Sequence, residues 1–149
     1  MLIKDILKPE NVSIIDSVTD WKDAVYLATK NLLDQGYITS DYPKAIIKNA
    51  IEHGAYFVLC PNVALLHATS SDGVNKTQLA LTLVKKPFYF DNKPDPVRLM
   101  ITLAAVDSKS HIGAMQQIGG MLLDDKTIND ILKIKDPKEL YERFANYKE

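Results

Sequence analysis

The sequence contains three histidines, His53, His67 and His111, and two of them stand where the local sequence suits chemistry. His67 ends an apolar, strand-like run and begins Ala68-Thr69-Ser70-Ser71-Asp72-Gly73, a loop of mostly small and hydroxyl-bearing residues. Backbone N–H groups in such a loop can approach an anion closely. A histidine at a strand end, facing such a loop, is well placed to act as a nucleophile and to carry a phosphoryl group.

His111 follows Asp107-Ser108-Lys109-Ser110, at the predicted first turn of a helix. The N-terminus of a helix offers free N–H donors and the positive end of its dipole, which favour a bound anion and oppose protonation of a nearby imidazole. Two imidazoles and a helix N-terminus around one loop would form a phosphate site without a metal.

These features also have plainer interpretations. A histidine at a strand end can be a structural residue, Ser/Thr-rich loops are commonly solvated turns, and His111 alone could lie on the surface. His53, beside Gly54, is interpreted as a helix C-terminal residue favoured by the dipole. Cys60 is interpreted as a buried, inert thiol rather than a nucleophile, and no HxH or HExxH spacing supports a zinc site. Spacing alone leaves the function open.

Composition indicates one ordinary globular domain over residues 1–149. The chain is 46% hydrophobic and 25% charged, with a net charge of -1 and no block of like charge. Nothing in this balance attracts nucleic acid or an anionic membrane, and no apolar run approaches the roughly 20 residues that span a bilayer. The first residues lack the pattern of a secretory signal. A single cysteine cannot form an internal disulfide, so we expect a cytoplasmic location.

Hydrophobic periodicity predicts a layered α/β domain. The predicted strands are 56–59, 63–66, 79–84 and 97–106, the last nearly continuous in apolar residues and therefore central. Between the last two we predict a loop over 85–96, whose Phe88 and Phe90 would either tuck into the core or help a partner to dock. The predicted helices are 21–32, 40–53, 110–123, 128–132 and 137–147.

Two segments resemble one known family. Residues 54–68, GAYFVLCPNVALLHA, resemble the phosphohistidine signature of the mannitol/fructose-type (type 2) IIA components of the sugar phosphotransferase system, and are most similar to the ascorbate-like branch. Residues 107–112, DSKSHI, are similar to the segment in which the family's second histidine opens a helix beside the first. Two matched segments about forty residues apart are more specific than either alone, and the resemblance covers nearly the whole chain.

The resemblance implies a fold, an activity and partners. The fold is a single α/β domain with a mixed, roughly five-stranded sheet flanked by helices on both faces. The activity is that of a cytoplasmic phosphocarrier, in which Nε2 of His67 accepts a phosphoryl group from phospho-HPr and passes it to a cysteine of the IIB component during sugar uptake. His111 would assist the transfer. We expect no cofactor and no metal, and the predicted phosphate-binding residues are Ala68, Thr69, Ser70 and Lys48.

The sequence departs from the family pattern at three points. Asn62 replaces the usual glycine, a mild change because asparagine tolerates a left-handed backbone. Leu66 replaces the proline that commonly precedes the active histidine, which frees the backbone beside it. Some relatives carry an arginine in the preceding helix, where this chain has Lys48 and no arginine before Arg98. Either Lys48 supplies that positive charge or the site functions without one.

Two alternatives stay open at this point. One is a IIA-like regulatory module whose phosphorylation reports sugar flux, and the other is a catalytically silent binding module in which His67 is structural. The sequence does not name the sugar, and it leaves the oligomeric state open, a homo-oligomer included.

Overall fold

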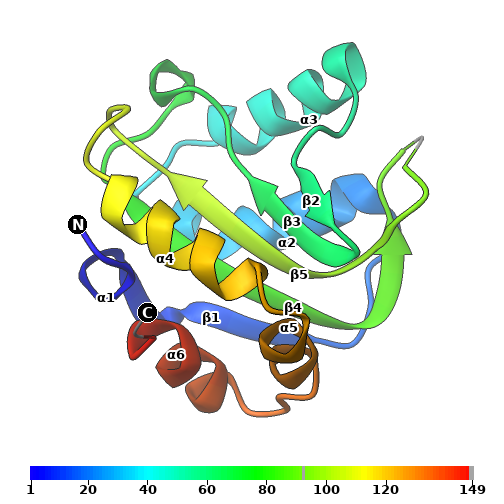
Figure 1. Cartoon of the computed structure of the whole chain (residues 1–149). Helices are drawn as coiled ribbons and strands as arrows, with labels where there is room; N and C mark the ends of the chain where they lie inside the picture. Colours follow the sequence, from blue (N-terminus) through cyan, green and yellow to red (C-terminus); the bar gives the residue numbers. More distant parts are fainter. Residues whose placement is uncertain (92, 148–149) are drawn as a thin grey trace.

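The structure, a computed structural model, describes residues 1–91 and 93–147 and is built around one mixed sheet (Figure 1). Its five strands lie in the order β1-β4-β5-β3-β2. The β1/β4 and β3/β5 pairs are parallel, whereas β4/β5 and β2/β3 are antiparallel. The strands are β1 (Leu7–Ile15), β2 (Val58–Cys60), β3 (Asn62–Leu66), β4 (Gln78–Tyr89) and β5 (Pro96–Ala104).

Helices cover both faces of this sheet, as the resemblance implied. One face packs against α2 (Trp21–Asp34) and α3 (Asp41–His53), and the other packs against α1, α4, α5 and α6 (Figure 1). The bounds of the second group are α1 (Ile3–Ile6), α4 (Ile112–Leu122), α5 (Asp125–Leu132) and α6 (Pro137–Ala145). A short 3-10 turn, η1 (Ser70–Asp72), follows β3.

Alternation along each central strand divides the apolar side chains between two cores. In β3, Val63 and Leu65 belong to the core under α4, while Ala64 and Leu66 belong to the core under α2 and α3. A strand buried on both faces has this continuous apolar sequence. Burying both faces holds the C-terminal end of β3 in place, and His67 follows directly.

The first two long helices form where the sequence predicts them. The side chain of Asp20 caps α2 by accepting a hydrogen bond from the Asp23 N–H at 2.8 Å. In α3, Pro43 lies in the first turn, where its missing N–H costs nothing, and Gly54 ends the helix with φ +81°. Ile51, near the end of this helix, is 61% exposed.

The periodicity of the sequence does not predict strand β1 or helix α1. The segment Lys8-Pro9-Glu10 interrupts the apolar pattern, and the register with β4 shifts between Leu7 and Val12. Because β1 is an edge strand, it tolerates a proline and a bulge that a central strand would not. Its hydrophobic residues therefore do not alternate as those of a regular strand do.

The predicted loop over 85–96 is wrong in its first part, because β4 continues to Tyr89. Phe88 and Phe90 are 8% and 1% exposed, with ring centroids 5.3 Å apart. Phe90 also contacts Phe57, with centroids 4.9 Å apart. Phe88 and Phe90 thus belong to the core and not to a docking edge, whereas Tyr89 is exposed.

The parallel pairing of β3 with β5 brings the two predicted histidines to one edge of the sheet. Leu66 pairs with Thr102 near the C-terminal ends of both strands. Parallel neighbours end at the same edge, so the loop that begins at His67 and the loop that leads to His111 leave the sheet side by side. Figure 1 shows the N-terminus of α4 at this edge.

Candidate functional site

A pocket of about 400 Å³ opens where these two loops meet. It is lined by His67 and His111 together, and by the predicted phosphate-binding residues of the loop after β3. The remaining lining residues come from α3, β3, the end of β5, the segment between β5 and α4, and α4 itself. The full lining is Tyr42, Leu65, His67, Ala68, Thr69, Ser70, Leu103, Ala105, Asp107, Ser108, His111 and Met115.

The imidazole of His67 is held by the backbone of its own strand. Its Nδ1 lies 3.0 Å from the carbonyl oxygen of Leu65. Since a carbonyl oxygen only accepts, Nδ1 carries the proton in this contact, and Nε2 of the neutral ring is the nitrogen with a free lone pair. The ring also meets Tyr56 edge-on, with centroids 5.5 Å apart and an interplanar angle of 82°. These contacts leave Nε2 as the ring nitrogen with an available lone pair.

The loop after His67 is stabilised by a capping interaction. The backbone N–H and the hydroxyl of Thr69 both donate to Oδ2 of Asp72, at 3.1 and 2.6 Å. This bonding shapes η1 and engages the Thr69 hydroxyl, which would have to exchange partners to donate to a phosphoryl group. Ser70 lies at the exposed start of η1 and lines the pocket.

Ala68, predicted to bind phosphate, does not have a free N–H to donate to an anion, because this N–H already has a partner. It donates to the hydroxyl oxygen of Tyr42 at 3.0 Å. Tyr42 is fully buried, and burial raises its pKa to about 12. The sequence analysis missed this residue. Its signal was a tyrosine in the buried stripe of α3, since a buried tyrosine hydroxyl requires a hydrogen-bonding partner.

His111 is the N-cap residue of α4 and is half-buried. Its Nδ1 is buried, and among the described residues it has no hydrogen-bond partner. The preceding turn is organised by Asp107, whose Oδ1 accepts from the N–H groups of Ser110 and Lys109 at 2.7 and 2.9 Å. These bonds, the one from Ser110 first, lower the pKa of the Asp107 carboxyl. The structure thus places a second, partly unsatisfied imidazole beside His67.

Lys48 is not brought to this pocket. Its side chain is 72% exposed and lies 4.0 Å from the Glu52 carboxylate one turn along α3. Arg98 is engaged elsewhere, because its Nε donates to the carbonyl oxygen of Val84 at 3.0 Å. Of the described residues that line the pocket, none is a lysine or arginine. An anion here would be held by imidazole, hydroxyl and backbone donors alone.

The two other residues considered from sequence do not join the site. His53 is exposed at the end of α3, with its Nε2 3.8 Å from the Glu52 carboxylate. Burial raises the pKa of the Cys60 thiol, which makes it a poor nucleophile. Within residues 1–91 and 93–147, no three His, Cys, Asp or Glu side chains gather into a metal site. In the same residues no helix has both the length and the apolar character needed to cross a membrane.

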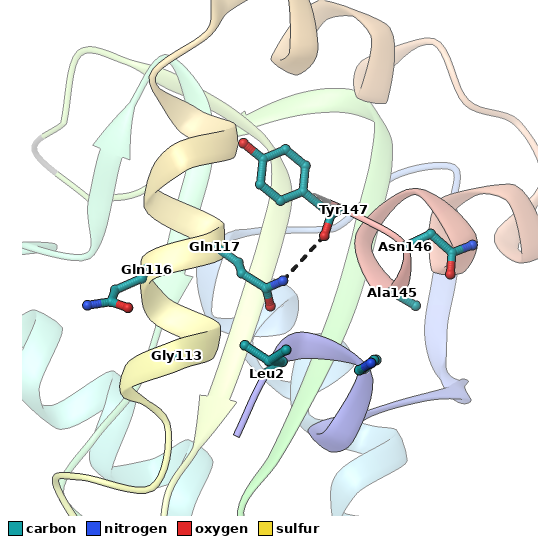
Figure 2. Close-up of a pocket in the computed structure, with 8 residues that line it drawn as sticks. Leu2, Gly113, Gln116, Gln117, Ala145, Asn146 and Tyr147 are labelled. Carbon is teal, nitrogen blue, oxygen red and sulfur yellow. Dashed lines mark hydrogen bonds between the residues drawn. The ribbon is translucent and has the colours of Figure 1, made fainter. Parts of the chain in front are cut away.

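A larger hollow of about 630 Å³ lies on another side of α4, between the two ends of the described chain (Figure 2). Figure 2 shows Gln117 directed toward Tyr147, whose carbonyl oxygen accepts from Gln117 Nε2 at 3.3 Å. Among the described residues that line it, Lys4 is the only charged side chain, and none is a histidine, cysteine or acid. Its size therefore does not make it the better candidate for chemistry.

Comparison with known proteins identifies the family and agrees with the fold. The model of the family "Phosphoenolpyruvate-dependent sugar phosphotransferase system, EIIA 2" matches residues 5–147. The chain belongs to this family of phosphotransferase IIA components.

Its relatives carry two sugar names. The mannitol-specific cryptic phosphotransferase enzyme IIA component of Escherichia coli K12 is 35% identical over 140 residues, covering 94% of this chain and 95% of the relative. The ascorbate-specific EIIA component of Mycoplasma pneumoniae is 34% identical over 140 residues, covering 93% and 88%. The solution structure of the E. coli mannitol-specific cryptic enzyme IIA superposes with a TM-score of 0.91 at 33% identity, over 99% of this chain and 100% of that one. The predicted fold class and family are thus confirmed.

Proposed function

We propose that this chain is a cytoplasmic phosphocarrier of a sugar phosphotransferase system, with His67 as the phosphorylated residue. The observation that carries the proposal is the contact between His67 Nδ1 and the Leu65 carbonyl oxygen, in a pocket shared with His111. This contact leaves Nε2 unprotonated in the neutral ring. A neutral imidazole near pH 7 needs no further activation, because its ordinary pKa is about 6.5.

In the first step, the lone pair of His67 Nε2 attacks the phosphorus of the phosphohistidine of HPr. The new N–P bond forms as the N–P bond of the donor breaks, and the donor imidazole leaves with that electron pair. The His67 ring gains positive charge in this step, and the Leu65 carbonyl oxygen stabilises it by accepting from Nδ1–H. Such a transfer through a loose transition state depends mainly on positioning and on donors to the equatorial oxygens.

In the second step, a cysteine thiolate of the IIB component attacks the same phosphorus. The S–P bond forms, the N–P bond breaks, and His67 returns to the neutral imidazole. His111 lines the same pocket and is proposed to donate to the phosphoryl oxygens in both steps. The absence of lysine and arginine from the described pocket lining suits a carrier, since it must release the group as readily as it receives it.

The proposal is tested by incubating the chain with enzyme I, HPr and labelled phosphoenolpyruvate, followed by mass spectrometry of the labelled peptide. We expect one acid-labile phosphoryl group on the peptide that contains His67. The exposed His53 provides a matched control, and His53→Ala should label as the wild type does. Labelling of a His67→Ala variant that remains folded would contradict the assignment.

A chase with a IIB component then separates the carrier from a regulatory module. Discharge of the label onto a IIB cysteine supports the carrier, whereas a stable phosphoprotein that no IIB component discharges supports the regulator. Because relatives are named for both mannitol and ascorbate, the IIB components of both systems should be compared.

A further inference from the structure

Tyr42 lies at the N-terminal end of α3, yet its hydroxyl reaches the point where β3 and β5 end. The residue is fully buried, and it lines the pocket that contains His67 and His111. Tyr42 is thus a titratable residue at the candidate site that the proposed phosphoryl-transfer steps do not use.

The hydroxyl of Tyr42 connects the two loops that form the site. It accepts from the Ala68 N–H at 3.0 Å and donates to the carbonyl oxygen of Leu103 at 2.5 Å. Ala68 is the residue after His67. Leu103 is the second-to-last residue of β5, and the segment that follows this strand leads to His111. The last β3–β5 register pair is Leu66 with Thr102. The hydroxyl therefore links the strands' extensions just beyond the point where their register pairing ends.

We propose that Tyr42 is a positioning residue for phosphoryl transfer, whose hydroxyl fixes the loop after His67 against the end of β5 and so sets the placement of His67 Nε2 relative to His111. This inference rests on the proposed phosphocarrier function. It assigns Tyr42 no contact with the phosphoryl group.

The chemistry of the hydroxyl suits a permanent connection. Burial raises its pKa to about 12, so it keeps its proton, and its bond to Leu103, throughout the range in which a neutral histidine reacts. Its removal would leave one buried carbonyl and one amide without their partner. Small displacements matter in such a site, because a misplacement of about 1 Å costs about 10²-fold in rate.

The test compares Tyr42→Phe, which keeps the ring and removes the hydroxyl, with Thr29→Val as a matched control. Thr29 is also buried, at 1% exposure, and its hydroxyl donates to the Val25 carbonyl within α2 at 2.9 Å. Both variants lose one buried hydroxyl, but only Tyr42 joins the two loops.

The measurement is single-turnover phosphorylation by phospho-HPr, well below the melting temperature of each variant. The end-point gives the fraction of folded, competent chains, and the rate constant at saturating phospho-HPr describes those chains alone. We expect the end-point and the concentration for half-maximal rate to stay near wild type in Tyr42→Phe. The rate constant should fall about tenfold, and the Ala68 amide should exchange its hydrogen faster. Thr29→Val should lower only the melting temperature.

A rate constant for Tyr42→Phe equal to that of wild type, or lowered equally in Thr29→Val, would overturn the inference while leaving the carrier function standing. If the wild-type chain takes no label on His67, the proposed function itself fails. Should Tyr42→Phe not fold, 3,5-difluorotyrosine at position 42 retains the hydroxyl but weakens it as an acceptor. A smaller fall in the rate constant is then expected, and an unchanged rate constant would overturn the inference.

Discussion

His67, just after β3, and His111, at the N-terminus of α4, line the same pocket, but their side chains are held in different ways. At the end of β3, His67 has its Nδ1 bonded to the Leu65 carbonyl oxygen and its ring against Tyr56. At the N-terminus of α4, His111 has a buried Nδ1 with no partner among the described residues. The ring proposed as the nucleophile thus has a fixed partner for one of its nitrogens, whereas His111 keeps a buried nitrogen without one.

The backbones around the two histidines are held by different kinds of partner. The loop after β3 is held by Tyr42, by the Thr69–Asp72 capping bonds and by Gly73 in a left-handed conformation with φ +109°. The turn before α4 is held by the Asp107 carboxylate, by a hydrogen bond from the N-terminal ammonium group to the Ser110 carbonyl oxygen, and by one from the Val106 N–H to Thr77 Oγ1. The comparison teaches that the ring proposed to bond to phosphorus is the one whose Nδ1 has a hydrogen-bond partner in the fold.

The largest expected effect comes from replacing His67, the histidine whose Nδ1 has a backbone partner. His67→Gln should abolish acid-labile phosphorylation from phospho-HPr, because an amide nitrogen has no lone pair available for attack. Since His67 is only half-buried, the melting temperature should change little. Phosphorylation assays and thermal melts of the same sample check both statements, and full labelling would contradict the role of His67.

The other histidine, His111, is tested by His111→Phe, which keeps a planar ring and removes both nitrogens. We expect transfer to the IIB component to slow by about 10²-fold, the usual cost of removing one preorganised donor. Stability should hold or rise slightly, because the variant removes a buried nitrogen that lacks a partner among the described residues. Rapid-quench transfer assays and urea unfolding measure the two effects. Unchanged transfer to IIB would show that His111 takes no part.

The loop after β3 is probed further by comparing Gly73→Ala with Gly36→Ala. Both glycines have positive φ, but a Cβ at Gly73 would lie 2.3 Å from Thr39 Oγ1, whereas at Gly36, which follows the end of α2, nothing lies within 4 Å. Gly36→Ala should cost about 1 kcal/mol of unfolding free energy for the left-handed backbone conformation alone. Gly73→Ala should cost about 2–3 kcal/mol, since displacement of Thr39 is added to the backbone cost. Equal urea midpoints would show that Thr39 moves aside freely.

The smallest effect concerns pH and the turn before α4. The pKa of Asp107 is lowered in the folded chain, chiefly by the hydrogen bond from the Ser110 N–H. Its stabilising contribution is therefore present above the ordinary carboxyl pKa and is lost as the pH falls through the lowered value. Between pH 5 and pH 2, wild type should lose slightly more melting temperature than Asp107→Asn, whose amide oxygen accepts both hydrogen bonds at every pH. Parallel losses would contradict this account.

Sequence reasoning succeeded where the determining interactions are local. The spacing of apolar residues and the Asp20 cap locate α2, and the chain's apolar runs locate β3, β4 and β5. That His67 and His111 share a pocket could not follow from spacing, since it depends on β3 pairing parallel with β5; the family resemblance supplied it. Tyr42 was missed because its partners lie 26 and 61 residues away. The sequence predicted Lys48 in the phosphate site, but its side chain lies outside the pocket. Which way a side chain on α3 points depends on how that helix packs against the sheet, and spacing along the sequence does not show this.

The order of strands in the sheet bears on how the chain reaches this fold. Strand β1 pairs with β4, joining Leu7 to Leu79, and β3 must await β5 before it gains its parallel neighbour. Contacts between residues so distant in sequence form slowly, because a long loop must close before any bond stabilises it. During synthesis, α2, α3 and β3 therefore leave the ribosome before the strands that cover them. We therefore expect the two histidines to meet late in folding, and a chain truncated before β5 to contain His67 without the strand that leads to His111.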